Sequence, residues 1–362
     1  MNASPSAPEA LRAALAGLLD GLPPTQAAAA VDRLIASYRG TTPTDAPVLR
    51  DRSDVAAYAA YRMPATFEAV RAAVDALREA APEWAPATHT DIGGGTGAAT
   101  WAVAEAWEEA ERAPRTTVLD WAEPALRLGR ELAVASGVPG LREARWERSR
   151  IGSALRIEDT DLVTVSYVLK ELTPEDRAAV VTEAARAARA VVIVEPGTPD
   201  GYDRIIEARD RLIAAGFRIA APCPHSAACP IVPGSDWCHF AARVSRSSLH
   251  RRVKGGSLAY EDEKFGYVVA TRFPAEPVPE RVIRKPQIRK GQVLLDLCAG
   301  GTEGEPAESA ESAESAESAG SAGGRQGQGL RRETVTKRHG VLYKAARDTE
   351  WGDRWPPRPA SR

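Results

Sequence analysis

Long hydrophobic runs are missing from this sequence. No stretch reaches the roughly 18 consecutive apolar residues that a membrane-spanning helix needs, although 44% of the 362 residues are hydrophobic. The segment from Met1 to Pro24 has no basic stretch ahead of its Ala/Leu-rich part and carries Glu9 and Asp20, so it does not resemble a secretion signal or a transit peptide. We therefore expect a cytoplasmic protein that has no membrane partner and acts as a monomer.

Cysteine and lysine are both scarce. The chain has four cysteines, and lysine accounts for seven of its 47 basic residues, which leaves 40 arginines. Arginine is the better residue for bidentate phosphate recognition, but an Ala- and Arg-rich composition also reflects GC-rich coding. In a cytoplasmic protein, four cysteines are not expected to form structural disulfides. They are therefore core thiols, metal ligands or redox groups, and their spacing has to decide among these three roles.

Changes in composition divide the chain into parts. At about 100–200 residues per domain, the length predicts two domains with additional segments. We expect a helical cap over residues 1–80, an α/β domain over 81–220, and a small β-rich domain made of 221–301 and 330–355. Residues 302–329 repeat Glu-Ser-Ala and then become Gly-rich. Such a composition cannot bury a core, so it predicts a disordered insert in the last domain.

The pattern between residues 87 and 220 alternates short apolar runs with helical periodicity. Repeated β-α units of this size predict a parallel sheet that is covered by helices on both faces. The predicted helices cover 8–22, 25–38, 54–80, Ala98–Arg112, Pro124–Ser136, Pro174–Ala187 and Tyr202–Ala215. The predicted strands cover Thr88–Ile92, Arg115–Asp120, Asp161–Tyr167, Ala190–Glu195, Tyr267–Thr271, Gln292–Leu297, Glu333–Lys337 and Val341–Lys344.

A glycine-rich turn, Asp91-Ile-Gly93-Gly-Gly95-Thr-Gly97, follows the first of these strands. Glycines let the backbone approach a ligand closely, and the next helix offers free N–H groups. The following strand ends in Asp120, which is placed to accept hydrogen bonds from ribose hydroxyls. Dinucleotide-binding domains use a related turn, but this form resembles motif I of class I methyltransferases more closely. We therefore predict a class I methyltransferase (Rossmann-like) fold that binds S-adenosyl-L-methionine through Asp91, Gly93, Gly95, Gly97 and Asp120.

The catalytic half of such a site cannot be assigned from the residues. Glu123 is a rival of Asp120 for the ribose, but it lies past the end of the strand. In methyltransferase folds the end of the fourth strand faces both cofactor and substrate, and this chain has Ser166-Tyr167 there. The Asn/Asp-Pro-Pro-Tyr motif of amino-methylating nucleic-acid enzymes and the nucleophilic cysteine of RNA cytosine-C5 enzymes are both absent. We expect Tyr167 to pack.

The four cysteines all lie after residue 220, with intervals of 5, 8 and 59 residues between Cys223, Cys229, Cys238 and Cys298. The first three occupy a polar, Pro-rich segment that is a poor place for inert core thiols. Structural zinc usually shows paired Cys-x2-4-Cys knuckles, which are absent, whereas an iron–sulfur cluster accepts one thiolate per iron from separate loops. Spacing alone leaves cluster and zinc equally open, with free thiols as a third alternative. His225 and His239 are expected outside the ligand shell, because four thiolates complete a site.

Taken together, these segments resemble the methyltransferase-like assembly factors of the ribosomal small subunit, which occur in mitochondria and have bacterial relatives labelled rRNA methyltransferases. The resemblance covers nearly the whole chain except the insert and the tails, and the cysteine segment is its most specific part. The matching stretches are Tyr61-Arg-Met-Pro-Ala65, Asp91-Ile-Gly-Gly-Gly-Thr-Gly97, Glu195-Pro-Gly-Thr-Pro199, Cys223-Pro-His225, Ala228-Cys-Pro230, Asp236-Trp-Cys-His-Phe240, Lys264-Phe-Gly-Tyr267, Leu295-Asp-Leu-Cys298 and Trp351-Gly-Asp353.

The resemblance implies a [4Fe-4S] cluster and binding to small-subunit rRNA in the pre-ribosomal small subunit. The implied cluster ligands are Cys223, Cys229, Cys238 and Cys298. We hypothesise that this cluster has a structural role, because it ties the loop 223–238 to the strand 292–298 across a long interval.

Basic runs in the C-terminal region fit an RNA partner. Between 243 and 290 there are twelve Lys/Arg against five Asp/Glu, and between 331 and 347 there are six against one. Lys/Arg clusters bind phosphates with little sequence preference, although a single run is also typical of a solvated surface. Three runs favour RNA: Arg251-Arg252-Val-Lys254, Arg284-Lys285 with Arg289-Lys290, and Arg331-Arg332 with Lys337-Arg338.

We thus expect an S-adenosylmethionine-binding, iron–sulfur protein that acts on small-subunit rRNA as a methyltransferase or as an assembly factor. The alternative is a non-catalytic RNA-binding assembly factor of the same fold with a structural zinc in place of the cluster. A radical enzyme is disfavoured, since the Cys-x3-Cys-x2-Cys loop of that chemistry is absent and a fourth thiolate closes the cluster.

Overall fold

The computed structural model of the chain describes residues 6–18, 25, 29, 31–32, 52–108, 113–247, 251, 257–300 and 329–357. The chain forms two units. The first consists of Met1–Pro222 and Pro233–Glu276, and the second consists of Cys223–Val232 and Pro277–Arg362. Residues 302–328 of the predicted insert and most of the predicted helix at 25–38 lie outside the described residues, whereas Gly329 begins a strand.

The first unit is built on one mixed sheet with the order β3-β2-β1-β4-β5-β8-β6, and β7 also pairs with β8. The neighbours from β3 to β5 are parallel, whereas β8 is antiparallel to β5, β6 and β7. This order, with one antiparallel strand inserted between β5 and β6, is that of the class I methyltransferase fold. The strands are β1 Thr88–Ile92, β2 Arg115–Asp120, β3 Arg145–Arg148, β4 Thr160–Ser166, β5 Ala188–Pro196, β6 Arg218–Ala221, β7 Phe240–Ser245 and β8 Tyr260–Thr271.

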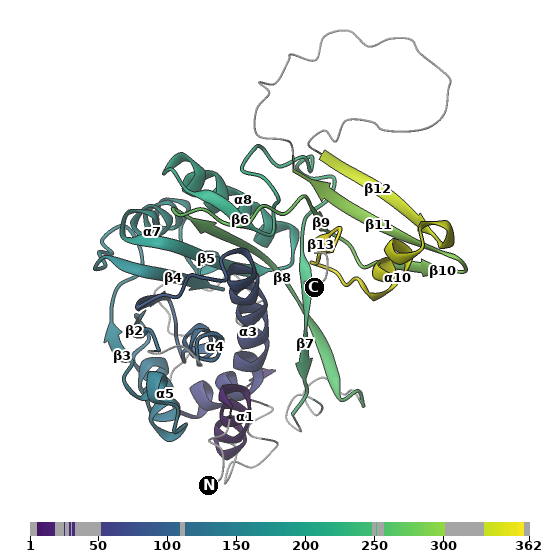
Figure 1. Ribbon diagram of the computed structural model, residues 1–362. Coiled ribbons are helices and arrows are strands. Elements are labelled where there is room, and N and C mark those ends of the chain that lie inside the picture. Colours follow the sequence, from purple (N-terminus) through teal and green to yellow (C-terminus); the bar gives the residue numbers. More distant parts are fainter. Residues whose placement is uncertain are drawn as a thin grey trace. The chain divides into compact units, whose positions relative to one another are not determined.

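Helices cover both faces of this sheet, as the sequence predicts. In Figure 1, α3, α4 and α5 lie against one face and α7 and α8 against the other. No described helix is both long enough and apolar enough to cross a lipid bilayer. The helical elements are α1 Ala7–Gly17, α3 Arg52–Ala80, α4 Ala98–Ala106, α5 Glu123–Ala135, α6 Pro139–Arg142, the 3-10 turn η1 Leu169–Glu171, α7 Pro174–Ala187 and α8 Pro199–Ala214.

The centre of the sheet explains why the fold is readable from sequence. Leu162, Val163 and Val165 of β4 and the run from Ala190 to Val194 in β5 are all fully buried or nearly so, which is typical of parallel strands covered on both faces.

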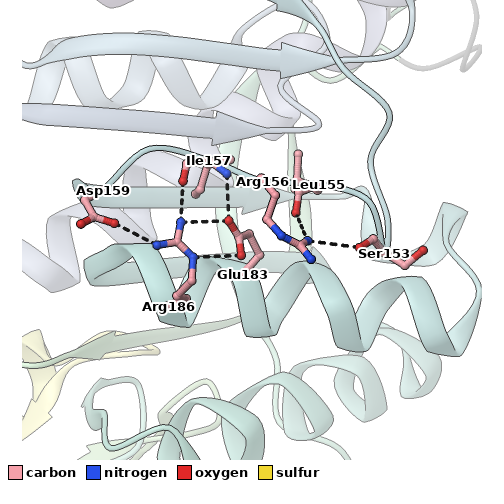
Figure 2. A network of polar contacts seen from close by, with 7 residues as sticks. All are labelled: Ser153, Leu155, Arg156, Ile157, Asp159, Glu183 and Arg186. Atoms are coloured by element: carbon pink, nitrogen blue, oxygen red, sulfur yellow. Dashed lines mark hydrogen bonds and ion pairs between the residues drawn. The ribbon is translucent and has the colours of Figure 1, made fainter.

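The segment that leads into β4 is fixed by a polar network (Figure 2): Glu183 of α7 accepts a hydrogen bond from the backbone N–H of Ile157 at 2.8 Å, and Arg186 pairs with both Glu183 and Asp159. This network fixes the end of β4 opposite to the glycine turn.

The division into units differs from the composition-based domains at residues 233–276. Their composition predicts that they belong to the C-terminal domain, but β8 pairs with β5 from Ala190 to Pro196 and belongs to the main sheet. The reason is its second half, since the residues from Phe265 to Thr271 are all buried. That continuous apolar run is what a central strand requires, and the basic residues around it obscured the signal.

The second unit contains a five-stranded sheet with the order β10-β11-β9-β13, in which β12 pairs with β11. Its hydrophobic core consists of Val282, Val293, Leu295, Leu297, Val335, Ala346 and Trp355. The prediction of a strand at Val341–Lys344 is wrong, because these residues begin the helix α10. This helix contributes Ala346 to the core and packs Leu342 and Tyr343 against it. The elements are β9 Glu280–Val282, β10 Gln287–Arg289, β11 Gln292–Ala299, β12 Gly329–Thr336, η2 Lys337–His339, α10 Val341–Asp348 and β13 Arg354–Trp355.

Candidate functional site

The glycine turn joins β1 to α4 in a conformation that only glycine adopts easily. The φ angles of Gly93, Gly95 and Gly97 are 68°, 55° and 87°, all in the left-handed region that disfavours side chains. Space is also restricted, because a Cβ at Gly93 would lie 2.6 Å from Val168 Cγ2 and one at Gly97 would lie 2.5 Å from the Trp146 ring. The backbone N–H of Gly93 donates to the Leu119 carbonyl at 2.8 Å, which ties the turn to β2.

Asp91 lies beneath the turn and holds it in place. Its carboxylate is fully buried and accepts hydrogen bonds from Thr100 Oγ1 at 3.1 Å and from Thr164 Oγ1 at 2.8 Å. Burial raises the pKa of Asp91 to about 6, against the effect of these two hydrogen bonds. A Cβ at Gly94 would lie 2.6 Å from Asp91 Oδ2, so the acid and the turn fit each other tightly. Asp91 is not one of the residues that line the cavity described below.

His89 extends this buried network along β1. Its Nε2 lies 2.8 Å from Thr164 Oγ1 and its Nδ1 lies 3.2 Å from Thr116 Oγ1. Since the Thr164 hydroxyl donates to Asp91, it accepts from His89, which assigns the proton to Nε2. Burial lowers the pKa of His89 to about 3, so the ring is neutral near pH 7. The network therefore joins β1, β2, β4 and α4 below the turn.

Asp120 ends β2 and faces the cavity. Its Oδ2 accepts a hydrogen bond from the backbone N–H of Gly95 at 2.9 Å, and its Oδ1 accepts one from Ala122 N–H at 2.8 Å. Burial raises the pKa of Asp120, while the backbone donors oppose this effect. Two backbone N–H groups leave lone pairs on both oxygens for further donors. Asp120 is thus held in one orientation, as expected for a residue that binds ligand hydroxyls.

A cavity of about 410 Å³ opens above the turn at the carboxyl ends of β1, β2 and β4. Its volume is in the range of small-molecule sites, and its place is where open α/β sheets bind ligands. Of the predicted cofactor residues, Gly93, Gly95 and Asp120 line it directly. Sequence reasoning did not assign to the site the side chains that α3, β3 and η1 contribute, since they lie outside the glycine-turn motif. These are Tyr58, Met63, Thr66, Arg148 and Glu171.

Tyr167, directly after β4, forms the opposite wall of the cavity. It is the one non-glycine residue with positive φ, 59°, within the described residues, a conformation that is strained for a side chain. Its hydroxyl donates to Glu263 at 3.0 Å, and the Arg62 guanidinium lies over its ring at 5.0 Å. Arg62 donates to both Glu263 oxygens, at 2.7 and 3.2 Å. Tyr167 thus packs as expected and also takes part in a partly buried network with the ion pair of Arg62 and Glu263.

The cysteine segment divides between the two units. Cys223 and Cys229 lie in the part of the loop that belongs to the second unit, together with Cys298 of β11, whereas Cys238 precedes β7 in the first unit. None of the four is in a disulfide. Among the described residues, no group of three or more Cys, His, Asp or Glu is arranged to hold a metal ion.

Within the second unit, the loop 223–232 nevertheless reaches the end of β11. Cys298 Sγ lies 3.6 Å from His225 Nε2, and a Cβ on Gly300 would lie 2.7 Å from the Pro224 carbonyl. The thiol of Cys298 is buried there. His225 thus lies beside a candidate ligand, and its role as an outer hydrogen-bonding partner stays a prediction. His239 stacks on Trp237 with ring centroids 5.3 Å apart, in the expected packing role.

The basic runs differ in their local partners. Arg331 pairs with Glu280 and Glu333, and Arg332 donates to both oxygens of Asp296, at 2.7 and 3.1 Å. By contrast, the backbone N–H of Lys337 donates to the Gly291 carbonyl at 3.2 Å, which brings two basic pairs to one end of the sheet. The pairs are Arg289 with Lys290 and Lys337 with Arg338, and we call these four exposed residues the basic end. In the described parts of the chain no carboxylate pairs with any of them.

Comparison with known proteins places the chain among ribosome-associated relatives. It is 28% identical over 323 residues to the human ribosome assembly protein METTL17, mitochondrial, a match that covers 83% of this chain and 62% of that protein. The Rsm22-cox11 tandem protein 2, mitochondrial, of Schizosaccharomyces pombe is 25% identical over 208 residues, which cover 46% of this chain and 24% of that protein. The chain therefore spans less than two thirds of the length of either relative.

Solved methyltransferases share low sequence identity with the chain. A magnesium protoporphyrin IX methyltransferase from Synechocystis with bound SAH has a TM-score of 0.38 at 15% identity, covering 67% of this chain and 94% of that one. A SAM dependent methyltransferase from Aquifex aeolicus has a TM-score of 0.37 at 13% identity, covering 62% and 100%. The fold class of this chain follows from its own strand order.

The family resemblance seen in the sequence is confirmed by a family-level match. The family model described as mitochondrial small ribosomal subunit Rsm22 matches residues 52–307 and 324–356, most of the chain. The chain belongs to this Rsm22 family, whose members include methyltransferase-like assembly factors of the ribosomal small subunit.

Proposed function

We propose that this chain is an S-adenosyl-L-methionine-binding assembly factor of the ribosomal small subunit. One observation carries the proposal: a cavity at the carboxyl ends of β1, β2 and β4 combines the glycine turn with Asp120, whose carboxylate is oriented by two backbone donors. Membership of the Rsm22 family and similarity to a ribosome assembly protein support the cellular role.

The cavity supplies groups for each part of S-adenosylmethionine. Asp120 accepts hydrogen bonds from the ribose hydroxyls, and the glycine turn lets the ligand approach the N-terminus of α4. Trp121, which is 39% exposed and lines the cavity, offers an apolar ring to the adenine. Because Asp91 has its oxygens occupied by Thr100 and Thr164, we assign it to holding the turn, with no direct contact to the ligand.

The four cysteines are proposed to hold a [4Fe-4S] cluster, with structural zinc as the alternative. The chemistry of the donor set supports this, since four thiolates that form no disulfide complete either site. In the second unit, the proximity of Cys298 to His225 fits a loop that closes over the end of β11. A bound cluster would contribute a covalent link between loop 223–232 and this strand, and His225 would donate a hydrogen bond to a thiolate.

Small-subunit rRNA is the proposed partner, and the basic end is its proposed contact. Arg289, Lys290, Lys337 and Arg338 are exposed side by side without carboxylate partners in the described residues, so their charge is available to phosphates. The ion-paired Arg331 and Arg332 contribute less, because Glu280, Glu333 and Asp296 neutralise them.

A second candidate function, rRNA methyl transfer, is favoured by one observation. Ser166, Tyr167 and Val168 line the same cavity as Asp120, so the position where methyltransferase folds receive their substrate adjoins the proposed cofactor. Tyr167 is engaged by Glu263 and Arg62 and does not serve as a free base. Assembly without catalysis is therefore the preferred function.

Cofactor binding is tested by calorimetry with S-adenosylmethionine. Asp120→Ala is expected to weaken binding at least about tenfold, since it removes a ligand acceptor that is worth about 1.5–3 kcal/mol. Asp200→Asn, on the exposed first turn of α8, is the matched control and should leave binding unchanged. Undetectable binding to the unmodified chain would refute the cofactor proposal.

The role is tested by a methyl-group census of small-subunit rRNA from a strain that lacks the gene. Accumulated immature subunits with every modification intact are expected for an assembly factor. Loss of one modification, restored by the unmodified chain and not by Asp120→Ala, would establish methyl transfer instead.

A further inference from the structure

The cavity carries an excess of carboxylates. Asp120 at the end of β2, Glu123 at the start of α5 and Glu171 on η1 line it, and Arg148 of β3 is the basic side chain among its lining residues. Tyr58 of α3 and Tyr167 after β4 complete the titratable groups of the lining. Such a cavity favours a ligand with net positive charge over a neutral ligand of the same shape.

Glu171 is less occupied than Asp120. Asp120 accepts two backbone hydrogen bonds, whereas no hydrogen bond or ion pair to the Glu171 carboxylate is found within the described residues. Glu171 lines the cavity and is exposed to solvent. Its carboxylate is therefore available to a ligand.

The backbone that carries Glu171 is nevertheless held firmly. Its N–H donates to the Val168 carbonyl at 3.0 Å, and the Val168 side chain packs against the glycine turn at Gly93. The N–H of Leu169 donates to buried Glu195 at 3.1 Å, and Arg204 donates to the same carboxylate at 2.6 Å. The 3-10 turn thus has a defined place beside the glycine turn, and Glu171 approaches the ligand from the side opposite to Asp120's strand.

We propose that Glu171 is a specificity-determining residue that recognises the positive charge of the bound cofactor and so distinguishes S-adenosylmethionine from S-adenosylhomocysteine. This inference rests on the proposed cofactor. The two molecules share the adenosine and amino-acid parts, and S-adenosylmethionine alone carries the sulfonium. An anion facing the amino-acid end of the ligand therefore stabilises the methylated form. If the anion is removed, only contacts that both forms share remain.

The state of Glu171 makes this discrimination dependent on pH. Burial of the carboxyl beside the cavity, followed by repulsion from Asp120 and Glu195, raises the pKa of Glu171 to about 7, although part of the side chain is exposed, and Lys170 opposes this shift. Below that pH the carboxyl is neutral and attracts no cation, whereas above it the carboxylate is formed. Affinity for S-adenosylmethionine should therefore rise between pH 6 and pH 8 relative to S-adenosylhomocysteine. The amine of the ligand also titrates, at a different pH in each ligand, and Glu171→Gln keeps this contribution while it removes that of Glu171.

The test is calorimetry of the full chain with each ligand at pH 6, 7 and 8. At pH 8 we expect the unmodified chain to prefer S-adenosylmethionine by about tenfold, the effect of a solvent-screened charge pair, and to lose most of this preference at pH 6. Glu171→Gln should bind both ligands about equally at every pH. Glu175→Gln, on the exposed first turn of α7, is the matched control and should keep the preference.

Two results would overturn the inference and leave the cofactor proposal intact. One is equal weakening of both ligands by Glu171→Gln, and the other is a preference in the unmodified chain that does not change with pH. The second measurement needs no variant, so it decides even if Glu171→Gln fails to fold. Binding of neither ligand to the unmodified chain would remove the cofactor proposal and this inference together.

Discussion

The two units of this protein prepare their candidate sites in different ways. In the first, Asp91, Asp120 and the glycine turn are held by hydrogen bonds to neighbouring strands and helices, and the cavity lies over a wide buried sheet. In the second, a core of seven buried residues supports exposed basic side chains and a loop with two cysteines. The first site is held by a wide sheet, while the second unit has the smaller core.

This difference indicates where a bound group contributes to folding. Small cores leave little net stability after the entropy of ordering the chain, so a metal group that joined loop to strand would have a large effect there. The proposed ligand of the first unit would add less to its stability, because the cavity already lies over a large core.

The largest effect is expected from Cys298→Ser. If four thiolates hold a cluster, this change removes one ligand at the end of β11 and should abolish iron binding and hydrogen-exchange protection in β9, β11 and β12. Protection in β1, β4 and β5 should stay unchanged. A second unit that remains protected, iron-free and bound to RNA would contradict the structural role of the cluster.

A smaller, local effect is expected from Gly97→Ala. The left-handed φ of 87° costs about 1–2 kcal/mol, and the clash of the new Cβ with the Trp146 ring at 2.5 Å adds about 1–3 kcal/mol. Gly137→Ala is the matched control, since its φ is 75° but nothing lies within 4 Å of the new Cβ. Urea unfolding should give a loss at least about twice as large for Gly97→Ala. Equal losses would show that the turn is not tightly packed.

The buried network below the turn predicts opposite pH responses for two variants. Because the pKa of His89 is lowered to about 3, its contribution to stability is present above the unfolded pKa of about 6.5 and is lost as pH falls. Because the pKa of Asp91 is raised to about 6, its contribution is present below about 4 and is lost as pH rises to 6.

In the unmodified chain these two effects oppose each other between pH 4 and 6. A variant that removes one of the two groups should therefore show the pH dependence of stability that the other group causes. His89→Gln should gain stability on acidification and Asp91→Asn should lose it, each by about 1–2 kcal/mol at pH 5 relative to pH 7. Urea midpoints of both variants at the two pH values measure this. The same pH response in both would mean that the two groups do not titrate as described.

The smallest effects are expected at the basic end of the second unit. Lys290→Ala and Lys337→Ala should each weaken binding of small-subunit rRNA fragments by about threefold and reduce the salt slope by about one. Arg332→Ala is the control, because Asp296 already neutralises that side chain. Fluorescence anisotropy over a range of salt concentrations distinguishes the two groups, and an equal loss for Arg332→Ala would refute the assignment of the RNA contact.

Local sequence signals identified much of the first unit. Thr88–Ile92 and Arg115–Asp120 are strands at the residues where they were predicted, because β-branched residues favour a strand and each segment ends in a turn that local chemistry marks. The positions of Gly93, Gly95 and Gly97 could be recognised for a similar reason, since positive φ and close approach exclude other residues.

Properties that depend on distant parts of the chain were decided by tertiary structure alone. The sequence by itself determined the class of fold, the glycine turn with Asp120, and the family. Only the folded chain placed β8 in the main sheet, turned Val341–Asp348 into a helix, and paired Arg332 with Asp296. It also brought Glu171 and Asp120 to one cavity. Periodicity and turn chemistry act over a few neighbouring residues, whereas strand pairing, ion pairing and a raised pKa depend on groups that are far apart in the chain.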